Sequence, residues 1–304
     1  MPAGLRRAVS PVMLLFAPGG AETFSKPAFE IAGVYGVLPH PDWAVALRSC
    51  FCFVTSPPTA RFAGMLEHKA WTAESLLRLL LRLFLLLGVT GLGAVAAERL
   101  WTGVEGETRQ FWSSTAASLV VQLGGITLIV FFLRENDLNW ETAFGLRRAG
   151  ATRQILLGLA VAVVVFGVAL LLIKLSQWLM REVHLTPQPQ SAIEALQSTT
   201  DPRRQAAVAL TAVVLAPVFE EVIFRGLLLV SLRQAGYPRF AFWGTAVFFA
   251  VTHLNLMTFL PLVFFAVVLN LFYLRTGSLV GPITAHAAFN ATNFFWVVLA
   301  GPGS

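Results

Sequence analysis

Charged residues are scarce in this sequence. Only 12% of its 304 residues are Asp, Glu, Lys or Arg, whereas 56% are hydrophobic, and the mean hydropathy is +0.71. Soluble domains carry about 25% charged residues, so this composition indicates a membrane protein. The net charge of +6 comes from basic residues that flank apolar runs. This pattern is typical of anchoring at an anionic membrane surface and argues against nucleic-acid binding.

Cysteine and several catalytic signatures are also rare or missing. Cys50 and Cys52 are the only cysteines, and two thiols separated by one residue suit neither a disulfide framework nor a four-ligand zinc site. The chain lacks a glycine-rich phosphate loop with its lysine, a Gly-x-Ser-x-Gly turn and a His-Glu-x-x-His helix. These absences argue against nucleotide hydrolysis, a serine nucleophile and the familiar zinc-protease helix.

The first 64 residues contain no apolar run that could span a bilayer. Arg6 and Arg7 precede a short apolar stretch, Val12–Ala17, which resembles a signal peptide but is shorter than the usual hydrophobic region. A second interpretation is that translation starts at Met65 and that residues 1–64 do not belong to the native protein. This second interpretation is favoured because Met65 begins a short basic segment that directly precedes the first span.

Apolar runs of about the 20 residues that a bilayer requires follow from residue 76 onward. We find seven, without an internal repeat, and the fifth and sixth are short; they are 76–97, 115–133, 155–180, 206–232, 240–254, 259–274 and 279–300. The predicted fold is therefore an all-α, polytopic membrane helix bundle. The one long polar connection, 181–205, contains Ser191–Leu196, which predicts one or two turns of interfacial helix. We interpret it as a connector, with a lid over a substrate entrance as the alternative.

Basic residues are distributed unevenly between the two sides of the predicted bundle. One side carries Lys69, Arg134, Arg147, Arg148, Arg153, Arg233, Arg239 and Arg275. The other carries Arg99, Arg109, Arg181, Arg203 and Arg204, with Glu98, Glu105 and Glu107 offsetting the first two. Because Lys and Arg are enriched in cytoplasmic loops, this bias predicts a cytoplasmic N-side and an external C-terminus.

Three charges lie within six residues, Glu220 to Arg225, of the fourth run, which is otherwise apolar. A charged side chain at the bilayer centre costs roughly 2.5–3.5 kcal/mol on insertion scales, so these residues need a partner or a function. Glu221 and Arg225 are four residues apart, share a helix face and form an ion pair in the favourable order. Glu220 points about 100° away and keeps no counter-ion on its own helix. This makes Glu220 the strongest candidate for chemistry.

Polar side chains from two other runs reach a similar depth. His253 follows Phe249 by four residues, and Asn290 follows His286 by four. At about 1.5 Å per residue, Glu220, His253 and His286 lie about 17–21 Å from the arginines at the ends of their runs. We therefore expect one shared site. Asn270 and Gln122 are interpreted as interhelical hydrogen-bonding residues.

This set of side chains predicts hydrolysis. A glutamate can take a proton from water, and histidines and an amide can donate hydrogen bonds to the developing oxyanion. A zinc ion held by Glu220, His253 and His286 is the open alternative, because two histidines and a carboxylate form a known zinc set. Metal dependence stays open at this point, with no cofactor certain.

The joint pattern resembles the CAAX protease and bacteriocin-processing (CPBP, or Abi) family of intramembrane proteases, which includes the type II CAAX prenyl endopeptidases. The resemblance extends from about Arg203 to Ala300, and its motifs are Glu220-Glu221-x-x-x-Arg225, Phe249-x-x-x-His253 and His286-x-x-x-Asn290. It implies about eight helices around a conical cavity open to the cytosol. It also implies that Glu220, helped by His253, activates water, that His286 and Asn290 hold the oxyanion, and that Arg225 holds Glu221.

The resemblance thus implies an endopeptidase that cuts a membrane-associated or lipidated protein or peptide, with the bilayer as its other partner. A non-catalytic scaffold or bacteriocin self-immunity protein is the alternative, and a proton-coupled transporter is a third interpretation. The alanine- and arginine-rich composition suggests a bacterial cytoplasmic membrane. The predicted parts are an N-terminal extension (1–64), N-terminal transmembrane helices with their loop (65–200) and a catalytic core (201–304).

Overall fold

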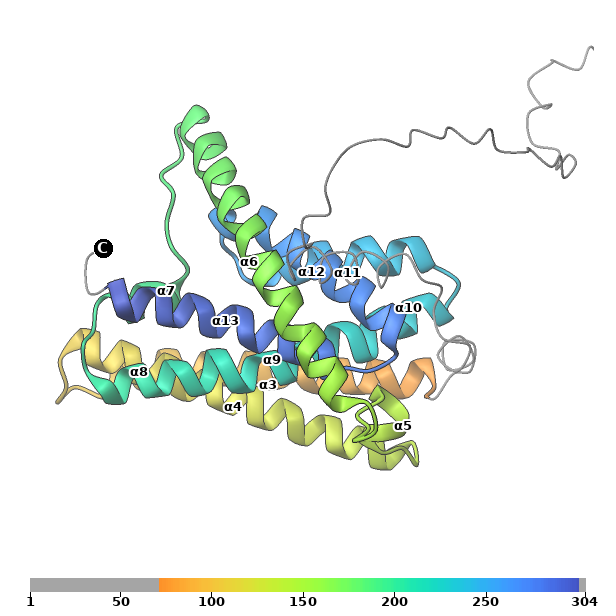
Figure 1. The fold of residues 1–304 in the computed structure, drawn as a ribbon. Coiled ribbons are helices and arrows are strands. Elements are labelled where there is room, and N and C mark those ends of the chain that lie inside the picture. The colour runs from red at the N-terminus through yellow and green to blue at the C-terminus, as the bar shows by residue number, and fades with distance from the viewer. Residues whose placement is uncertain (1–70, 301–304) are drawn as a thin grey trace, which may run out of the picture. The chain divides into compact units, whose positions relative to one another are not determined.

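Figure 1 shows the structure, a computed structural model, which describes residues 71–300 of the chain. This part is helical throughout and contains no strand, so the all-α prediction is confirmed for it. The helices are α3 (Ala73–Leu100), α4 (Gly106–Glu135), α5 (Trp140–Phe144), α6 (Ala151–Glu182), α7 (Ser191–Gln197), α8 (Pro202–Val208), η1 (Ala209–Leu215), α9 (Ala216–Glu221), η2 (Val222–Leu229), α10 (Val230–Gln234), α11 (Pro238–Thr252), α12 (Leu256–Thr276) and α13 (Val280–Ala300). The expectations for residues 1–64, Cys50, Cys52, Met65 and Lys69 lie outside the described residues.

Five helices of the described part are long and apolar enough to cross a membrane; they are α3, α4, α6, the continuous helix Pro202–Gln234 and α12. Each coincides with a predicted run. The predicted fifth and seventh runs are also helical, as α11 and α13, but neither is among these five. α11 has 15 residues and is about 22 Å long, shorter than the hydrocarbon core of about 30 Å. The count of seven to eight spans is therefore not confirmed.

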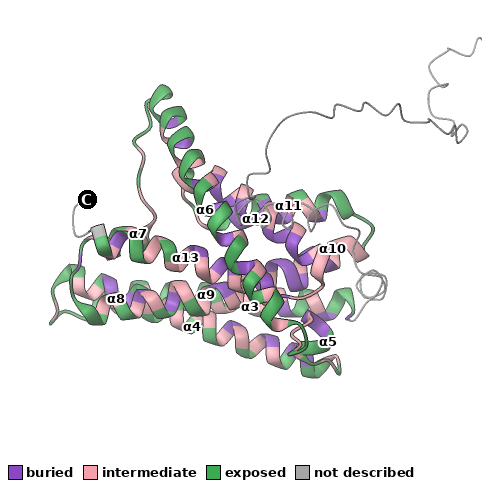
Figure 2. Ribbon diagram, viewed as in Figure 1, coloured by how far each residue is buried: buried purple, intermediate pink, exposed green. Residues whose placement is uncertain are grey.

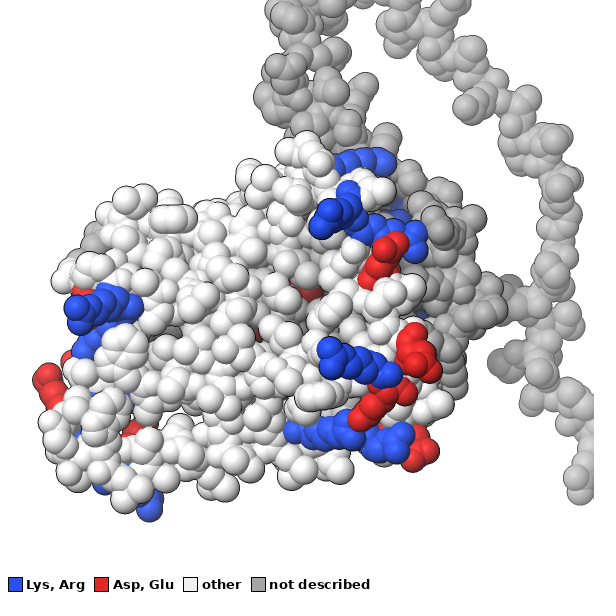
Figure 3. Space-filling model, turned by 90° about the horizontal axis from the view of Figure 1, so that it is seen from below, with Lys and Arg blue, Asp and Glu red and all other residues white. Residues whose placement is uncertain are grey.

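The surface of these helices fits a lipid environment. In Figure 3 the charged side chains gather at the two ends of the helices, and the broad band between them carries almost none. Large apolar side chains such as Phe84, Leu92 and Val163 are mostly exposed, and Figure 2 shows this outward exposure along α3 and α6. Apolar side chains exposed over whole helices are stable in lipid, where water does not contact them.

The helix that carries the two glutamates is not uniformly α-helical. It begins at Pro202 and ends at Gln234, and two π-helical segments, η1 and η2, lie on either side of the short α9. π-helical turns widen the helix by one residue and occur often at functional sites. Pro217 lies at the start of α9, where the missing N–H of proline interrupts the regular hydrogen-bond ladder.

Close packing of α6 on α13 forms one wall of the bundle. A Cβ added at Gly158 would lie 2.7 Å from the backbone oxygen of Gly281 and 2.9 Å from the Cβ of Thr284. The absence of a side chain therefore lets the two backbones approach, as small residues do in membrane helix pairs. This contact holds α13, which carries His286 and Asn290, against the rest of the bundle.

We predict that Gly158→Ala destabilises the protein by about 1–3 kcal/mol, because the new methyl group meets backbone that cannot turn away. The matched control is Gly167→Ala on the same helix, where an added Cβ has nothing within 4 Å. The measurement is the thermal midpoint of unfolding in detergent. Equal midpoints for the two variants would show that this close contact does not exist.

Candidate active site

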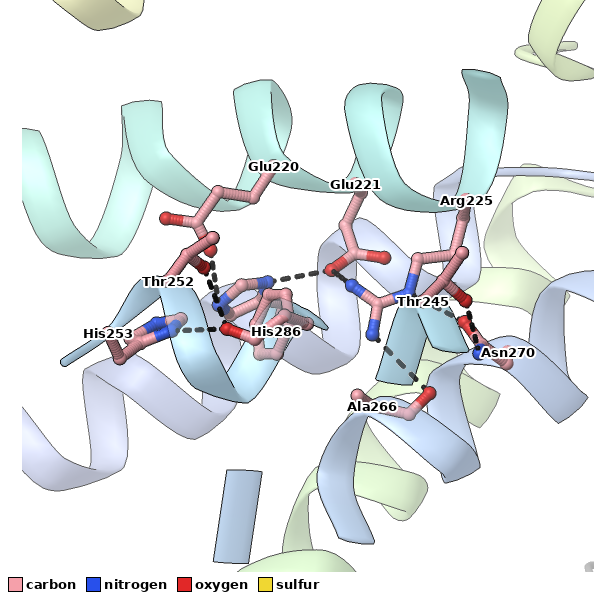
Figure 4. A network of polar contacts seen from close by, with 10 residues as sticks. Glu220, Glu221, Arg225, Thr245, Thr252, His253, Ala266, Asn270 and His286 are labelled. Carbon is pink, nitrogen blue, oxygen red and sulfur yellow. Dashed lines mark hydrogen bonds and ion pairs between the residues drawn. The ribbon is translucent and has the colours of Figure 1, made fainter. Parts of the chain in front are cut away.

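The predicted ion pair between Glu221 and Arg225 is present and completely buried. Arg225 Nη1 donates to Glu221 Oε1 at 2.7 Å, and both residues have a relative exposure of 0%. Figure 4 shows the two side chains lying side by side below their helix. Because each charge is removed from solvent, either one alone would be strongly destabilising.

Arg225 also contacts α12, a helix distant in the sequence. Its Nε donates to Asn270 Oδ1 at 3.2 Å, and its Nη2 contacts the backbone oxygen of Ala266 at 3.4 Å. The Asn270 amide nitrogen in turn donates to the Phe242 backbone oxygen and to Thr245 Oγ1. Asn270 therefore joins α11, α12 and η2, as the interhelical interpretation expected, and it also orients the guanidinium group.

Phe249 forms a buried apolar layer beneath the charged groups. Its ring centroid lies 4.7 Å from Arg225 Cζ, 4.8 Å from the His253 ring and 5.7 Å from the His286 ring. The side chain has no solvent exposure. Its ring thus contacts the guanidinium group and both imidazoles, which fits a structural-support role for Phe249 and leaves that role a prediction.

His286 lies between the two glutamates. Its Nδ1 is 2.8 Å from Glu221 Oε1, and its Nε2 is 3.8 Å from Glu220 Oε2. A carboxylate paired with arginine only accepts hydrogen bonds, so His286 Nδ1 carries the hydrogen of the first contact. Glu221 therefore fixes the ring of His286 with Nε2 facing Glu220, as Figure 4 shows.

Glu220 differs from Glu221 in its surroundings. Its side chain retains 25% exposure and lines a pocket of about 400 Å³, and its Oε2 is buried without a hydrogen-bond partner in the described structure. His253, His286 and Asn290 line the same pocket. The structure thus brings Glu220, His253 and His286, which sequence reasoning placed at one depth, into one pocket together with Asn290, whereas Glu221 lies behind His286 and outside the pocket lining.

Asn290 is positioned by the proline of the glutamate helix. In η1 the N–H of Ala216 donates to the backbone oxygen of Thr211, five residues earlier. The same spacing would pair the N–H of residue 217 with the backbone oxygen of Ala212, but residue 217 is a proline and has no N–H. The oxygen left without that donor is Ala212 O, and Asn290 Nδ2 donates to it at 2.8 Å. This contact uses one of the two amide hydrogens of Asn290.

His253 ends α11 at the edge of the pocket. Its Nδ1 lies 2.8 Å from the backbone oxygen of Phe249, and because a carbonyl only accepts, Nδ1 carries the hydrogen. In the neutral ring this leaves Nε2 as a hydrogen-bond acceptor. Figure 4 shows His253 on the same side of the network as Glu220.

Two further helices form walls of the pocket; the wall from α4 was not predicted from the sequence, and the wall from α7 was considered only as the alternative to a plain connector. Ser118 and Gln122 of α4 line the pocket, and so do Ile193 and Leu196 of α7. The connecting loop is attached nearby, because Gln190 Nε2 donates to Thr258 Oγ1 at 3.0 Å. The predicted helical turns at Ser191–Leu196 are confirmed, and they cover part of the site as well as connecting two helices.

Gln122 does not fit its sequence interpretation. We expected an interhelical hydrogen bond, but its Oε1 is buried and accepts none from the described residues. The sequence signal for a site residue is weak here, because a single glutamine in an apolar run is typical of helix association.

No group of three His, Cys, Asp or Glu side chains within residues 71–300 is arranged to hold a metal ion. His286 and His253 each direct Nδ1 to a protein acceptor, so Nε2 is the ring nitrogen left for another partner. Histidine ligands of metal ions are commonly held through their other ring nitrogen in this way. The zinc site of Glu220, His253 and His286 considered above therefore stays a prediction.

The fold and the pocket define an all-helical membrane protein with a buried carboxylate–imidazole site. Residues 202–292 match the model of the family described as type II CAAX prenyl endopeptidase Rce1-like. This match confirms the predicted resemblance and supports a CAAX-type intramembrane protease in general. No curated protein and no solved structure matches the chain. The matched segment contains α8 to most of α13, and with it all of the predicted site residues.

The pocket lies toward the end of the bundle that carries fewer basic residues. From Glu220 it extends to Leu196 of α7 and Trp296 of α13. The arginine-rich connections lie at the opposite ends of the same helices, where Leu279 N donates to Phe144 O at 3.1 Å. Two expectations are therefore incompatible. If the arginine-rich end is cytoplasmic, the pocket opens toward the other side, and access from the cytoplasm requires the reverse orientation.

We predict that Arg225→Met destabilises the protein by about 3–5 kcal/mol, because it leaves Glu221 as an unpaired buried charge. Combining it with Glu221→Gln restores part of the stability, since the charge is then gone. The measurement is the thermal midpoint in detergent. The control is Arg82→Met, whose half-exposed pair with Glu135 should contribute less than about 1 kcal/mol. Equal losses for Arg225 and Arg82 would contradict the anchoring role.

We predict from the arginine bias that residue 149 is cytoplasmic and residue 200 is not. Ala149→Cys and Thr200→Cys are each made in a Cys50→Ser/Cys52→Ser background, and both positions are exposed. In intact bacterial cells a membrane-impermeant maleimide should then label only Thr200→Cys, and both after lysis. Labelling of Ala149→Cys alone would reverse the orientation and place the pocket on the cytoplasmic side.

Proposed function

We propose that this protein is an intramembrane endopeptidase in which Glu220 activates water to hydrolyse a peptide bond of a membrane-associated or lipidated substrate. The observation that carries the proposal is the contrast between two adjacent carboxylates. Glu221 is completely buried and paired with Arg225, whereas the side chain of Glu220 keeps 25% exposure and faces a pocket beside His253, His286 and Asn290. Of the two carboxylates, only Glu220 is therefore placed to accept a proton within that pocket.

In the proposed reaction a water molecule lies between Glu220 and the substrate carbonyl. The water oxygen forms a bond to the carbonyl carbon while one of its protons passes to the Glu220 carboxylate. His253 Nε2 accepts a hydrogen bond from the same water and orients it. When the C–N bond breaks, Glu220 returns the proton to the departing amine, so the enzyme ends the cycle unchanged.

The developing oxyanion would be held from the opposite wall by α13. Asn290 has a second amide hydrogen, because its contact with Ala212 uses one of the two. His286 faces the same pocket and is held there because its Nδ1 donates to Glu221, so its Nε2 can donate to the oxyanion only when the ring is doubly protonated. An oxyanion donor such as the Asn290 amide often contributes about 3 kcal/mol to the transition state. Asn290 is already fixed by Ala212 O and His286 by the Glu221 side chain, so neither residue would need to be ordered during the reaction step.

The substrate class follows from the pocket and from the family match. The lining is mainly apolar, with side chains such as Ile173, Leu262 and Phe289 around the polar cluster. This suits a hydrophobic or lipidated peptide entering from the bilayer, and it offers no basic surface for nucleic acid. The non-catalytic scaffold or self-immunity protein of the same family remains the competing function.

We predict that Glu220→Gln lowers cleavage by at least about 100-fold with little change in stability, because an amide cannot accept the proton. The substrates are internally quenched hydrophobic peptides ending in Cys-aliphatic-aliphatic-X, with and without an S-farnesyl group. Cleavage is measured on purified protein in detergent, and the thermal midpoint is recorded for each variant.

The matched control is Glu74→Gln, whose carboxylate is exposed at the start of α3 and forms a surface pair with Arg78. It should cleave like the wild type. Cleavage that survives Glu220→Gln would contradict the proposed role. No cleavage by the wild type, together with a host phenotype that Glu220→Gln leaves untouched, would favour the scaffold.

A further inference from the structure

Gln122 on α4 lines the pocket together with Glu220 and carries a buried amide oxygen, Oε1, without a hydrogen-bond partner among the described residues. A buried acceptor left in this state costs about 1–3 kcal/mol relative to one that is hydrogen-bonded. Such a group in a native site indicates a missing partner, which is either water or a ligand.

The position of Gln122 is set by the packing of α4 against the glutamate helix. Gly125 lies three residues further along α4, on the same face, and a Cβ there would overlap the ring of Phe219, the neighbour of Glu220. Ser118, four residues before Gln122, also lines the pocket. One face of α4 therefore forms the wall next to Glu220, and Gln122 is the amide on that face.

A primary amide has a donor and an acceptor in fixed relation, and a peptide backbone presents the complementary pair of C=O and N–H. Hydrocarbon and prenyl chains present neither. The pocket is otherwise mainly apolar, so a peptide held in it would need a partner for its backbone groups. Asn290 donates an amide hydrogen to Ala212 and His253 donates Nδ1–H to Phe249, whereas Gln122 Oε1 is an amide acceptor that no described residue uses.

We propose that Gln122 binds the backbone of the substrate peptide next to the cleaved bond, with Oε1 accepting a backbone N–H. This rests on the proposed function for the reaction but concerns binding, which can be measured without cleavage. Gln122 acts here as a positioning residue. It holds the carbonyl at the distance that Glu220 and the attacking water require, and it takes no part in proton transfer.

The test replaces single backbone N–H groups of the quenched peptide by ester oxygens, one position at a time, leaving the cleaved bond intact. In the wild type one ester position near that bond should raise KM or lower kcat/KM by about tenfold, the effect of one lost hydrogen bond. Gln122→Met keeps the length of the side chain but removes the acceptor. In this variant the natural peptide should already show the tenfold effect on KM or kcat/KM, and the ester at the same position should cause no further change.

Stability separates this role from a structural one. Gln122→Met removes a buried unsatisfied acceptor, so its thermal midpoint should be unchanged or higher while peptide binding falls. The matched control is Gln154→Met on α6, whose Oε1 is also buried without a partner but which does not line the pocket. In Gln154→Met the effect of each ester position on KM and kcat/KM should be the same as in the wild type.

Binding of the same peptides is also measured in the Glu220→Gln background, where cleavage does not interfere. An ester effect on binding that disappears with Gln122→Met supports the proposal even if the wild type fails to cleave. Cleavage with an identical ester profile in wild type and Gln122→Met would mean that Gln122 holds only water, and would overturn the proposal alone. Peptides that neither bind nor are cleaved would overturn both proposals.

Discussion

The rest of the site depends on one buried oxygen, Oε1 of Glu221. It accepts from Arg225 at 2.7 Å and from His286 at 2.8 Å, and no solvent reaches it. Through Arg225 the contact extends to Asn270 on α12, and through His286 to α13. A single carboxylate thus joins three helices in an environment where an unpaired charge would be very unfavourable.

This arrangement explains why two adjacent glutamates can have different roles. Neighbouring residues on a helix point about 100° apart, so one side chain enters the interior while the other faces the pocket. Glu221 uses its charge to organise the helices, and Glu220 keeps its carboxylate for the pocket. The π-helical segments on both sides of α9 and the proline at its start adjust this stretch, and Asn290 supplies the donor that Pro217 cannot.

Much of the site could be predicted because it follows from helical spacing. The Glu221–Arg225 pair results from a separation of four residues, and the common depth of Glu220, His253 and His286 from counting residues to the helix ends. The number of spans could not be predicted in the same way. α13 carries polar residues that face the site, and α11 is short, so neither resembles an ordinary span although both are helices.

The contacts between helices far apart in the chain could not be predicted from the helical spacing of residues. Nothing in the sequence places Asn270 against Arg225 or Asn290 against Ala212, because each contact depends on how helices far apart in the chain pack together. For the same reason the sequence could not decide whether α7 is a connector or covers the pocket. Gln122 was interpreted as a helix-pairing residue for the same reason. The direction in which the pocket opens relative to the arginine-rich end also required the structure.

The most direct test of the central contact is ¹⁵N NMR of histidine-labelled protein, with the His286 signals assigned by their loss in His286→Gln. Because Glu221 can only accept, the account predicts a hydrogen on Nδ1 of His286 and a change in that signal when Glu221 is replaced by Gln. A ring that carries its hydrogen only on Nε2, or a signal indifferent to Glu221, would contradict it.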